Sequence, residues 1–241
     1  MNPLASKLSS TVSRFAFGGF ASALAVGCVT THHVAPPVNT GLHGTALPIE
    51  SPAVTASTSL NAAPSSGYVS TDGDLAIPLS DRVTLDGGMS FAAHPATQWQ
   101  GLASGRAGAR YQLSDGPRAR WVVGGGGTLG MAADGELLWG PWASIGVAGK
   151  RPDVRPFLDL GAQVTVYDRY AASAGTLRGG FEMGKGPVAV QAWGGPTLHA
   201  GRVDSTTFVV PHALCATHDS VRLDPGLAFG VSGRFGGTRV R

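Results

Sequence analysis

Three potential metal ligands stand at a regular spacing near the carboxyl end of the chain. His212, Cys215 and His218 follow one another three residues apart. Imidazole nitrogen and thiolate sulfur are ligands that zinc and copper accept, so the three could meet one ion. The same residues also fit a loop with an incidental cysteine and two exposed histidines, which is the interpretation we favour. We expect no other cofactor.

Groups used in hydrolysis lie close to these ligands. Asp204 and Ser205 precede them, and His199 begins the same predicted loop, 199–220. A catalytic triad needs a nucleophile and a base in hydrogen-bond contact, held in place by a third group. A long loop rarely provides such a geometry, and no nucleophile-elbow pattern surrounds Ser205. We therefore expect that the protein is not an enzyme, with a lipid-modifying enzyme as an alternative.

A glycine pattern of the dinucleotide-binding type runs from Gly125 to Gly130. It binds a pyrophosphate only where a helix follows, because the amino end of that helix holds the phosphates. Here an alternating, strand-like pattern continues instead, so we reject a dinucleotide site. We expect the glycines to relieve crowding inside a narrow barrel.

The amino terminus has the pattern of a secretory signal. Lys7 and Arg14 supply positive charge, and the apolar run from Phe15 to Val26 is too short to span a bilayer as a helix. The run ends in Leu24-Ala25-Val26-Gly27-Cys28, which resembles a bacterial lipobox, with its leucine one place early. The resemblance implies that Cys28 is lipidated (palmitate among its acyl chains) and becomes the new amino terminus. An ordinary cleaved signal or a signal anchor is the alternative.

The lipobox resemblance also bears on location and charge. Val29 follows the cysteine where an aspartate would retain lipoproteins of enteric bacteria at the inner membrane, so the resemblance implies a lipid anchor in the outer membrane. Removing residues 1–28 removes Lys7 and Arg14 and no acid, so 18 basic residues against 15 acidic become 16 against 15. The excess of basic over acidic residues therefore comes largely from the signal peptide, and we expect no nucleic-acid partner.

Three regions follow from composition and pattern. Residues 1–28 are the predicted signal peptide, the proline-rich stretch 29–52 is a predicted disordered linker, and 53–241 is the predicted barrel domain. In the last region apolar residues alternate with small or polar ones, as they do on strands with one apolar face. Nine clear strands are predicted at 67–79, 82–91, 102–113, 118–132, 137–150, 155–167, 175–184, 188–198 and 221–235.

The connections between these strands decide the strand count. Short turns alternate with mostly longer loops, as in outer-membrane barrels, where the short turns face the periplasm. If the turn at 80–81 is periplasmic, strand 67–79 runs inward and needs a partner that runs outward before it. The weakly patterned stretch 53–60 is the best candidate. The sequence therefore predicts an all-β, antiparallel up-and-down β-barrel of about ten strands, with eight as the alternative.

The low charge indicates which face points outward. Only 14% of the residues are charged, against roughly 25% in soluble domains, and the polar face consists mainly of Gly, Ala, Ser and Thr. The stretch 53–235 resembles the small bacterial outer-membrane β-barrel families, with Phe235 near the terminal position that the assembly machinery reads. The resemblance implies outer-membrane lipid as a partner, together with the barrel-assembly and lipoprotein-sorting machinery. A tethered, soluble lipocalin-like barrel that carries an apolar ligand is the alternative.

Charged residues on the polar face should then lie inside the barrel. Because unpaired charges there would be costly, we expect them to pair across a largely closed lumen rather than to line an ion path. The function expected is that of a non-enzymatic lipoprotein with a structural or surface-interaction role. The predicted lumen charges are Asp86, Arg106, Arg110, Arg118, Arg120, Asp159, Arg178, Glu182, Arg222, Asp224 and Arg234.

Overall fold

The structure is a computed structural model. Among the residues it describes, no helix is long and apolar enough to cross a membrane. For 30–33, 202–207 and 220–222 it describes the backbone alone. The described residues are 30–33, 47, 49–63, 67–93, 101–132, 135–151, 153–166, 171–184, 187–207 and 220–237.

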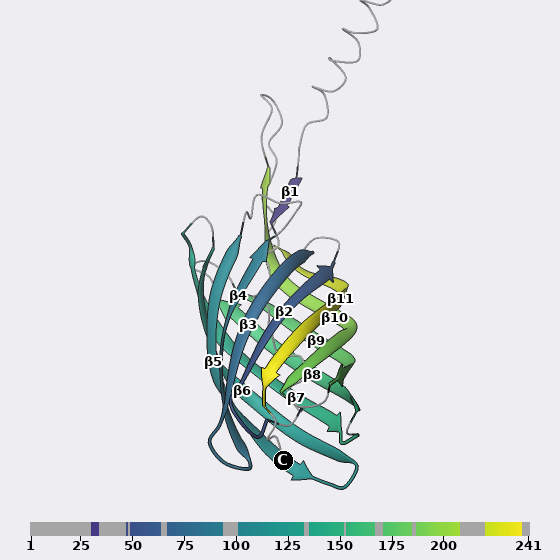
Figure 1. The fold of residues 1–241 in the computed structure, drawn as a ribbon. Coiled ribbons are helices and arrows are strands. Elements are labelled where there is room, and N and C mark those ends of the chain that lie inside the picture. Colours follow the sequence, from purple (N-terminus) through teal and green to yellow (C-terminus); the bar gives the residue numbers. More distant parts are fainter. Residues whose placement is uncertain are drawn as a thin grey trace, which may run out of the picture. The chain divides into compact units, whose positions relative to one another are not determined.

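Long antiparallel strands make up almost all of the described chain (Figure 1). Each strand pairs with the next one along the sequence from β2 to β11, and β11 pairs with β2, so ten strands close a barrel. Their bounds are β2 (Ala53–Ala62), β3 (Tyr68–Pro78), β4 (Val83–Ala93), β5 (Leu102–Asp115), β6 (Ala119–Ala132), β7 (Leu137–Gly149), β8 (Val154–Val166), β9 (Ala171–Met183), β10 (Val188–Thr207) and β11 (Ser220–Gly236).

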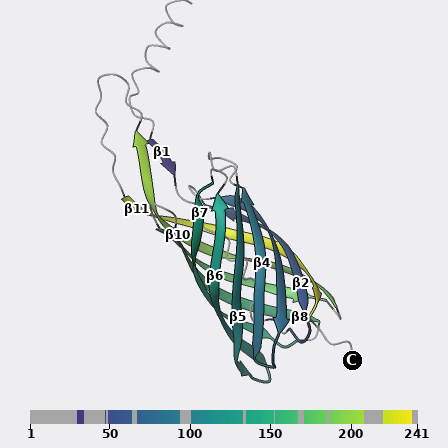
Figure 2. The ribbon, with the colours of Figure 1, turned by 90° about the vertical axis from the view of Figure 1, so that its left-hand side faces the viewer.

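The chain divides into two compact units. In the smaller unit, β1 (Thr30–His33) pairs antiparallel with Asp204–Thr207, the last residues of β10. The larger unit is the barrel, which includes β10 as far as Val203. Figure 2 shows the barrel turned, with its strands tilted against the barrel axis as closure of a sheet requires.

The two ends of the barrel differ in their connections. The short-turn end carries the connections 79–82, 116–118, 150–153 and 184–187, and the long-loop end carries 63–67, 94–101, 133–136 and 167–170. Both ends of the barrel's chain meet at the short-turn end. There the Gly236 amide donates to the Pro187 carbonyl at 2.6 Å, and the Glu50 amide donates to the Gly237 carbonyl at 2.7 Å.

The apolar side chains of the strands point away from the barrel axis. On β7 exposed and buried residues alternate, with Trp139 57% exposed and Trp142 4% exposed. Aromatic side chains on the outer face lie near strand ends, with Tyr111 and Trp121 toward the short-turn end and Phe91 and Trp139 toward the long-loop end. An apolar exterior with aromatic side chains at both rims is typical of membrane barrels. This orientation is the opposite of that in a lipocalin-like carrier, whose apolar face lines the interior.

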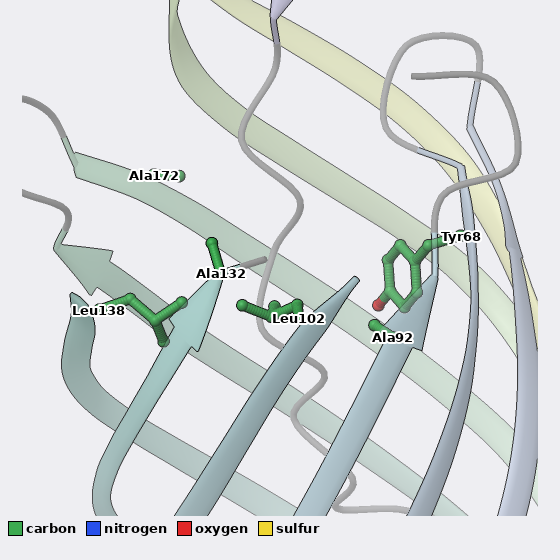
Figure 3. Close-up of a cluster of buried hydrophobic side chains, with 6 residues drawn as sticks. All are labelled: Tyr68, Ala92, Leu102, Ala132, Leu138 and Ala172. Atoms are coloured by element: carbon green, nitrogen blue, oxygen red, sulfur yellow. The ribbon is translucent and has the colours of Figure 1, made fainter. Parts of the chain in front are cut away.

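Inside the barrel, two apolar clusters flank a polar middle. The long-loop cluster consists of Tyr68, Ala92, Leu102, Ala132, Leu138 and Ala172, which reach inward from separate strands (Figure 3). The Leu47 cluster lies toward the short-turn end and consists of Leu47, Val122, Ala148, Phe157, Trp193 and Ala228.

The structure confirms the predicted architecture, including the weakly patterned strand β2. It differs from the prediction in several places, among them β1 (Thr30–His33), which falls within the predicted linker. β9 begins at Ala171 rather than 175, and β10 continues to Thr207 instead of ending at 198. Leu47, which falls within the predicted linker, is only 4% exposed because it packs inside the barrel.

Candidate functional site

A four-strand row of polar side chains centres on Glu182. Arg155, Glu182, Gln191 and Ser232 lie directly opposite one another on β8, β9, β10 and β11. Arg234 donates to both carboxylate oxygens of Glu182 at 2.8 Å. Arg155 donates to Glu182 at 3.1 Å and the Gln191 amide donates at 3.0 Å, while the Ser232 hydroxyl donates to Gln191 at 2.9 Å. Because Glu182 is 2% exposed, its carboxylate is held by two arginines away from bulk water.

A second set of ion pairs joins β3, β4 and β5. The Arg110 guanidinium donates to both oxygens of Asp86, with 2.6 Å between Nε and Oδ2. Arg106 pairs with Asp74, although β4 lies between their strands. The residue between them on β4 is Gly88, where an added Cβ would overlap the Asp74 carboxylate. The absence of a side chain at Gly88 is therefore what lets this ion pair form.

Hydroxyl groups join the same polar region. The Ser57 and Ser70 hydroxyls donate to Asp72 at 3.3 and 3.4 Å, and the Ser59 and Ser70 hydroxyls lie 2.7 Å apart. All of these side chains are buried. Small hydroxyl side chains thus fill the space beside the charged pairs instead of leaving it open.

Large aromatic side chains are buried inside the barrel as well. Trp142, Phe157 and Trp193 are each at most 6% exposed although they lie on the polar parity of their strands. The guanidinium carbon of Arg178 lies 4.7 Å from the centre of the Trp193 ring, a cation–π geometry. A Cβ at Gly230 would overlap the Trp193 ring, so glycine makes room for the aromatic side chain.

His199 belongs to a strand rather than to a loop. It lies on β10, is 3% exposed and has its Nε2 atom 2.9 Å from the amide nitrogen of Asn61. Asp224 lies directly opposite on β11. Thr197 donates to the Asn61 carbonyl oxygen at 3.5 Å. The described residues around His199 therefore hold a buried polar cluster that bulk solvent does not reach.

Open space lies at the short-turn mouth. One cavity of about 620 Å³ is lined by Ile49, Glu50, Asp81, Gln112, Asp115 and Arg120, among others. A neighbouring cavity of about 290 Å³ reaches Lys150 and Arg155. A third, smaller cavity of about 30 Å³ is lined by Leu47, Arg110 and Val122, among others.

Most of the predicted lumen charges whose side chains are described lie in the lumen. Asp86, Asp159, Arg178, Glu182, Asp224 and Arg234 are buried, and Arg106 and Arg110 are nearly so, at 9% and 13% side-chain exposure. Arg120 is half-buried at the short-turn mouth, where it donates to Asp115 at 3.2 Å. Arg118 is exposed instead, because β5 ends at Asp115 and β6 begins only at Ala119, which leaves Arg118 in the turn.

Other predicted residues lie outside the described part. These are Cys28 and the candidate metal ligands His212, Cys215 and His218, together with the side chain of Arg222. Within the described residues no three His, Cys, Asp or Glu side chains are grouped to hold a metal ion. The prediction missed Asp72, Asp74 and Arg155, although the alternation in strand 67–79 already put both aspartates on the polar face.

The paired charges give a direct prediction about stability. Glu182→Gln should lower the free energy of unfolding by about 3–5 kcal/mol, because it leaves two arginines near a neutral amide in a buried site. Asp115→Asn is the matched control. Asp115 contacts Lys150 at 2.6 Å but is 41% exposed, so that change should cost less than about 1 kcal/mol. Urea titration of the barrel in lipid vesicles measures both values, and equal losses would contradict the role given to Glu182.

No protein family model and no curated protein matches the sequence. Solved structures with a similar fold are bacterial outer-membrane β-barrels. An outer membrane channel from Pseudomonas putida F1 is 13% identical, with 83% of this chain and 100% of that chain covered and a TM-score of 0.43. For the outer membrane protease OmpT from Escherichia coli the identity is 9%, the coverage 79% and 97%, and the TM-score 0.38. The KdgM porin is 7% identical, with 76% and 98% covered and a TM-score of 0.35.

Proposed function

We propose that the protein is a non-enzymatic outer-membrane β-barrel lipoprotein with a largely closed lumen, acting in envelope structure or surface contact. The observation that carries this proposal is the filling of the lumen. Ion pairs centred on Glu182 and Asp86, the ring of Trp193 and the side chain of Leu47 occupy space that a channel would leave to water. With the lumen filled, the long-loop end of the barrel is the part that contacts other molecules.

The outer face supports the membrane location. It presents Leu, Val, Ile and Phe side chains that would be costly to hold in water, and the barrel closure leaves no strand edge for lipid to meet. Outer-membrane lipid is therefore the proposed partner of this face. Phe235 points outward at the end of β11, 54% exposed, where the barrel-assembly machinery could read it.

The chemistry of the lumen supports a non-enzymatic role. The buried carboxylates Asp86 and Glu182 already accept hydrogen bonds from arginines of the barrel wall, so they are not available as catalytic bases. His199 is buried against Asn61 rather than beside a serine hydroxyl. Among the described side chains we find no nucleophile and base in hydrogen-bond contact within an open cavity.

Conductance measurements test the closed lumen. Purified wild-type protein in planar bilayers should show no steady single-channel current, because side chains from all sides fill the barrel. Replacing both Phe157 and Trp193 by alanine removes two large rings from the Leu47 cluster and should create measurable conductance. Heat-shifted gel mobility checks that the variant is folded. A steady current through the wild-type protein would contradict the proposal.

The lipid anchor has its own test. Cys28→Ala should abolish incorporation of labelled fatty acid and leave a differently processed precursor, whereas Cys215→Ala should keep the label. The barrel should insert in both variants, since its strands make the membrane contacts. Equal labelling of Cys28→Ala and the wild-type protein would overturn the lipoprotein assignment while leaving the barrel untouched.

A further inference from the structure

The two larger cavities at the short-turn mouth differ in charge. They adjoin each other, since Glu50 and Asp115 are among the residues that line both. Of the charged side chains that line only one of the two, Lys150 and Arg155 belong to the cavity of about 290 Å³, and Asp81 belongs to the cavity of about 620 Å³. The mouth therefore has a basic side next to an acidic side. Its size is that of small-ligand sites, which measure roughly 300–1,000 Å³.

The pairing of β6, β7 and β8 places the basic side. Arg120 on β6 lies directly opposite Ala148 on β7, and Ala148 lies opposite Phe157 on β8. Ala148 and Phe157 are buried inside the barrel. Arg155 lies two residues before Phe157, so it shares the inward face of β8 but stands closer to the turn. The small side chain of Ala148 leaves room between the two guanidinium groups, which line the same cavity.

The cations of the basic side have donors to spare. Arg120 Nε and Lys150 Nζ contact the same Asp115 oxygen, at 3.2 and 2.6 Å. Arg155 donates to Glu182 at 3.1 Å, and that carboxylate is shared with a second arginine. An ammonium group has three N–H donors and a guanidinium group has five, so most donors of these cations have no acceptor among the described residues. An anionic group from outside would supply the missing acceptors.

The acidic side has the opposite need. Neither the Glu50 nor the Asp81 carboxylate contacts a cation in the part of the chain that the structure describes. Arg82, the next residue in the sequence, lines the smaller third cavity rather than this one. Ser80 and Gln112 also line the acidic side and can bond a neutral polar group. A cationic group such as an ammonium is the partner that this side lacks.

We infer that the short-turn mouth binds a short peptide with free ends, its carboxylate held by Lys150 and Arg155 and its amino group directed toward Glu50 and Asp81. A carboxylate suits the planar donors of a guanidinium group, and its single charge limits repulsion from Asp115. Inorganic phosphate would bring more negative charge beside Asp115 and nothing for the acidic side. This inference goes beyond the proposed function, because it adds a contact at the end opposite the long loops.

Titration calorimetry of the full-length protein with trialanine tests the site. Trialanine should bind saturably, and Lys150→Gln should weaken binding about tenfold through loss of a charge-assisted hydrogen bond. Arg118→Gln is the matched control, because it removes the same charge from the same end but Arg118 is exposed in the turn and lines neither cavity. It should leave binding unchanged. Heat-shifted gel mobility confirms that each variant is folded.

Blocked peptides show whether both ends are recognised. Trialanine amide and N-acetyl-trialanine should each bind at least about tenfold more weakly than trialanine, because each lacks one of the two charges. Absence of saturable binding would overturn the inference, and so would equal losses in Lys150→Gln and Arg118→Gln. Binding of phosphate as tightly as trialanine would mean an unspecific anion site and would also overturn it. None of these results depends on conductance, so they are independent of the test of the closed lumen.

Discussion

Closure of β11 on β2 is the contact on which the rest of the structure depends. In lipid no water is present to satisfy backbone N–H and C=O groups, so an open sheet edge would cost several kcal/mol for each unpaired group. The ladder from Leu227–Ala62 to Gly236–Ala53 removes both edges at once. Once the edges are gone, the outer face can be entirely apolar, and the polar parity of every strand is forced into the interior.

Because the polar residues of each strand face inward, polar and charged side chains line the lumen. Charged side chains from several strands meet in a space too narrow to hydrate each of them, so they are held in pairs such as Arg234–Glu182 and Arg110–Asp86. Glycines at positions such as Gly88 and Gly230 provide the room for those pairs and for the aromatic rings. Packing of this kind stabilises a closed barrel.

The sequence predicts the architecture but not which charged side chains pair. Alternation on β6 and β7 was strong enough to place their faces, whereas β2 is poor in large apolar residues and was predicted only because the turns required another strand. The end of β10 was missed because His199 to Thr207 shows no apolar alternation. Arg106–Asp74 and Arg234–Glu182 bridge strands that are not neighbours, and such contacts depend on register and barrel closure. Leu47 is a single buried residue outside any alternating stretch, so no sequence pattern indicates its burial.

The central claim is that the apolar parity faces lipid and the polar parity faces the lumen. Fluorescence quenching by lipids brominated along the acyl chain tests it on one strand. In a variant that keeps only Trp139, with the other tryptophans replaced by phenylalanine, the brominated lipid should quench strongly. In the variant that keeps only Trp142 it should quench weakly, even though Trp142 lies nearer the middle of β7. Strong quenching of Trp142 with weak quenching of Trp139 would contradict the account.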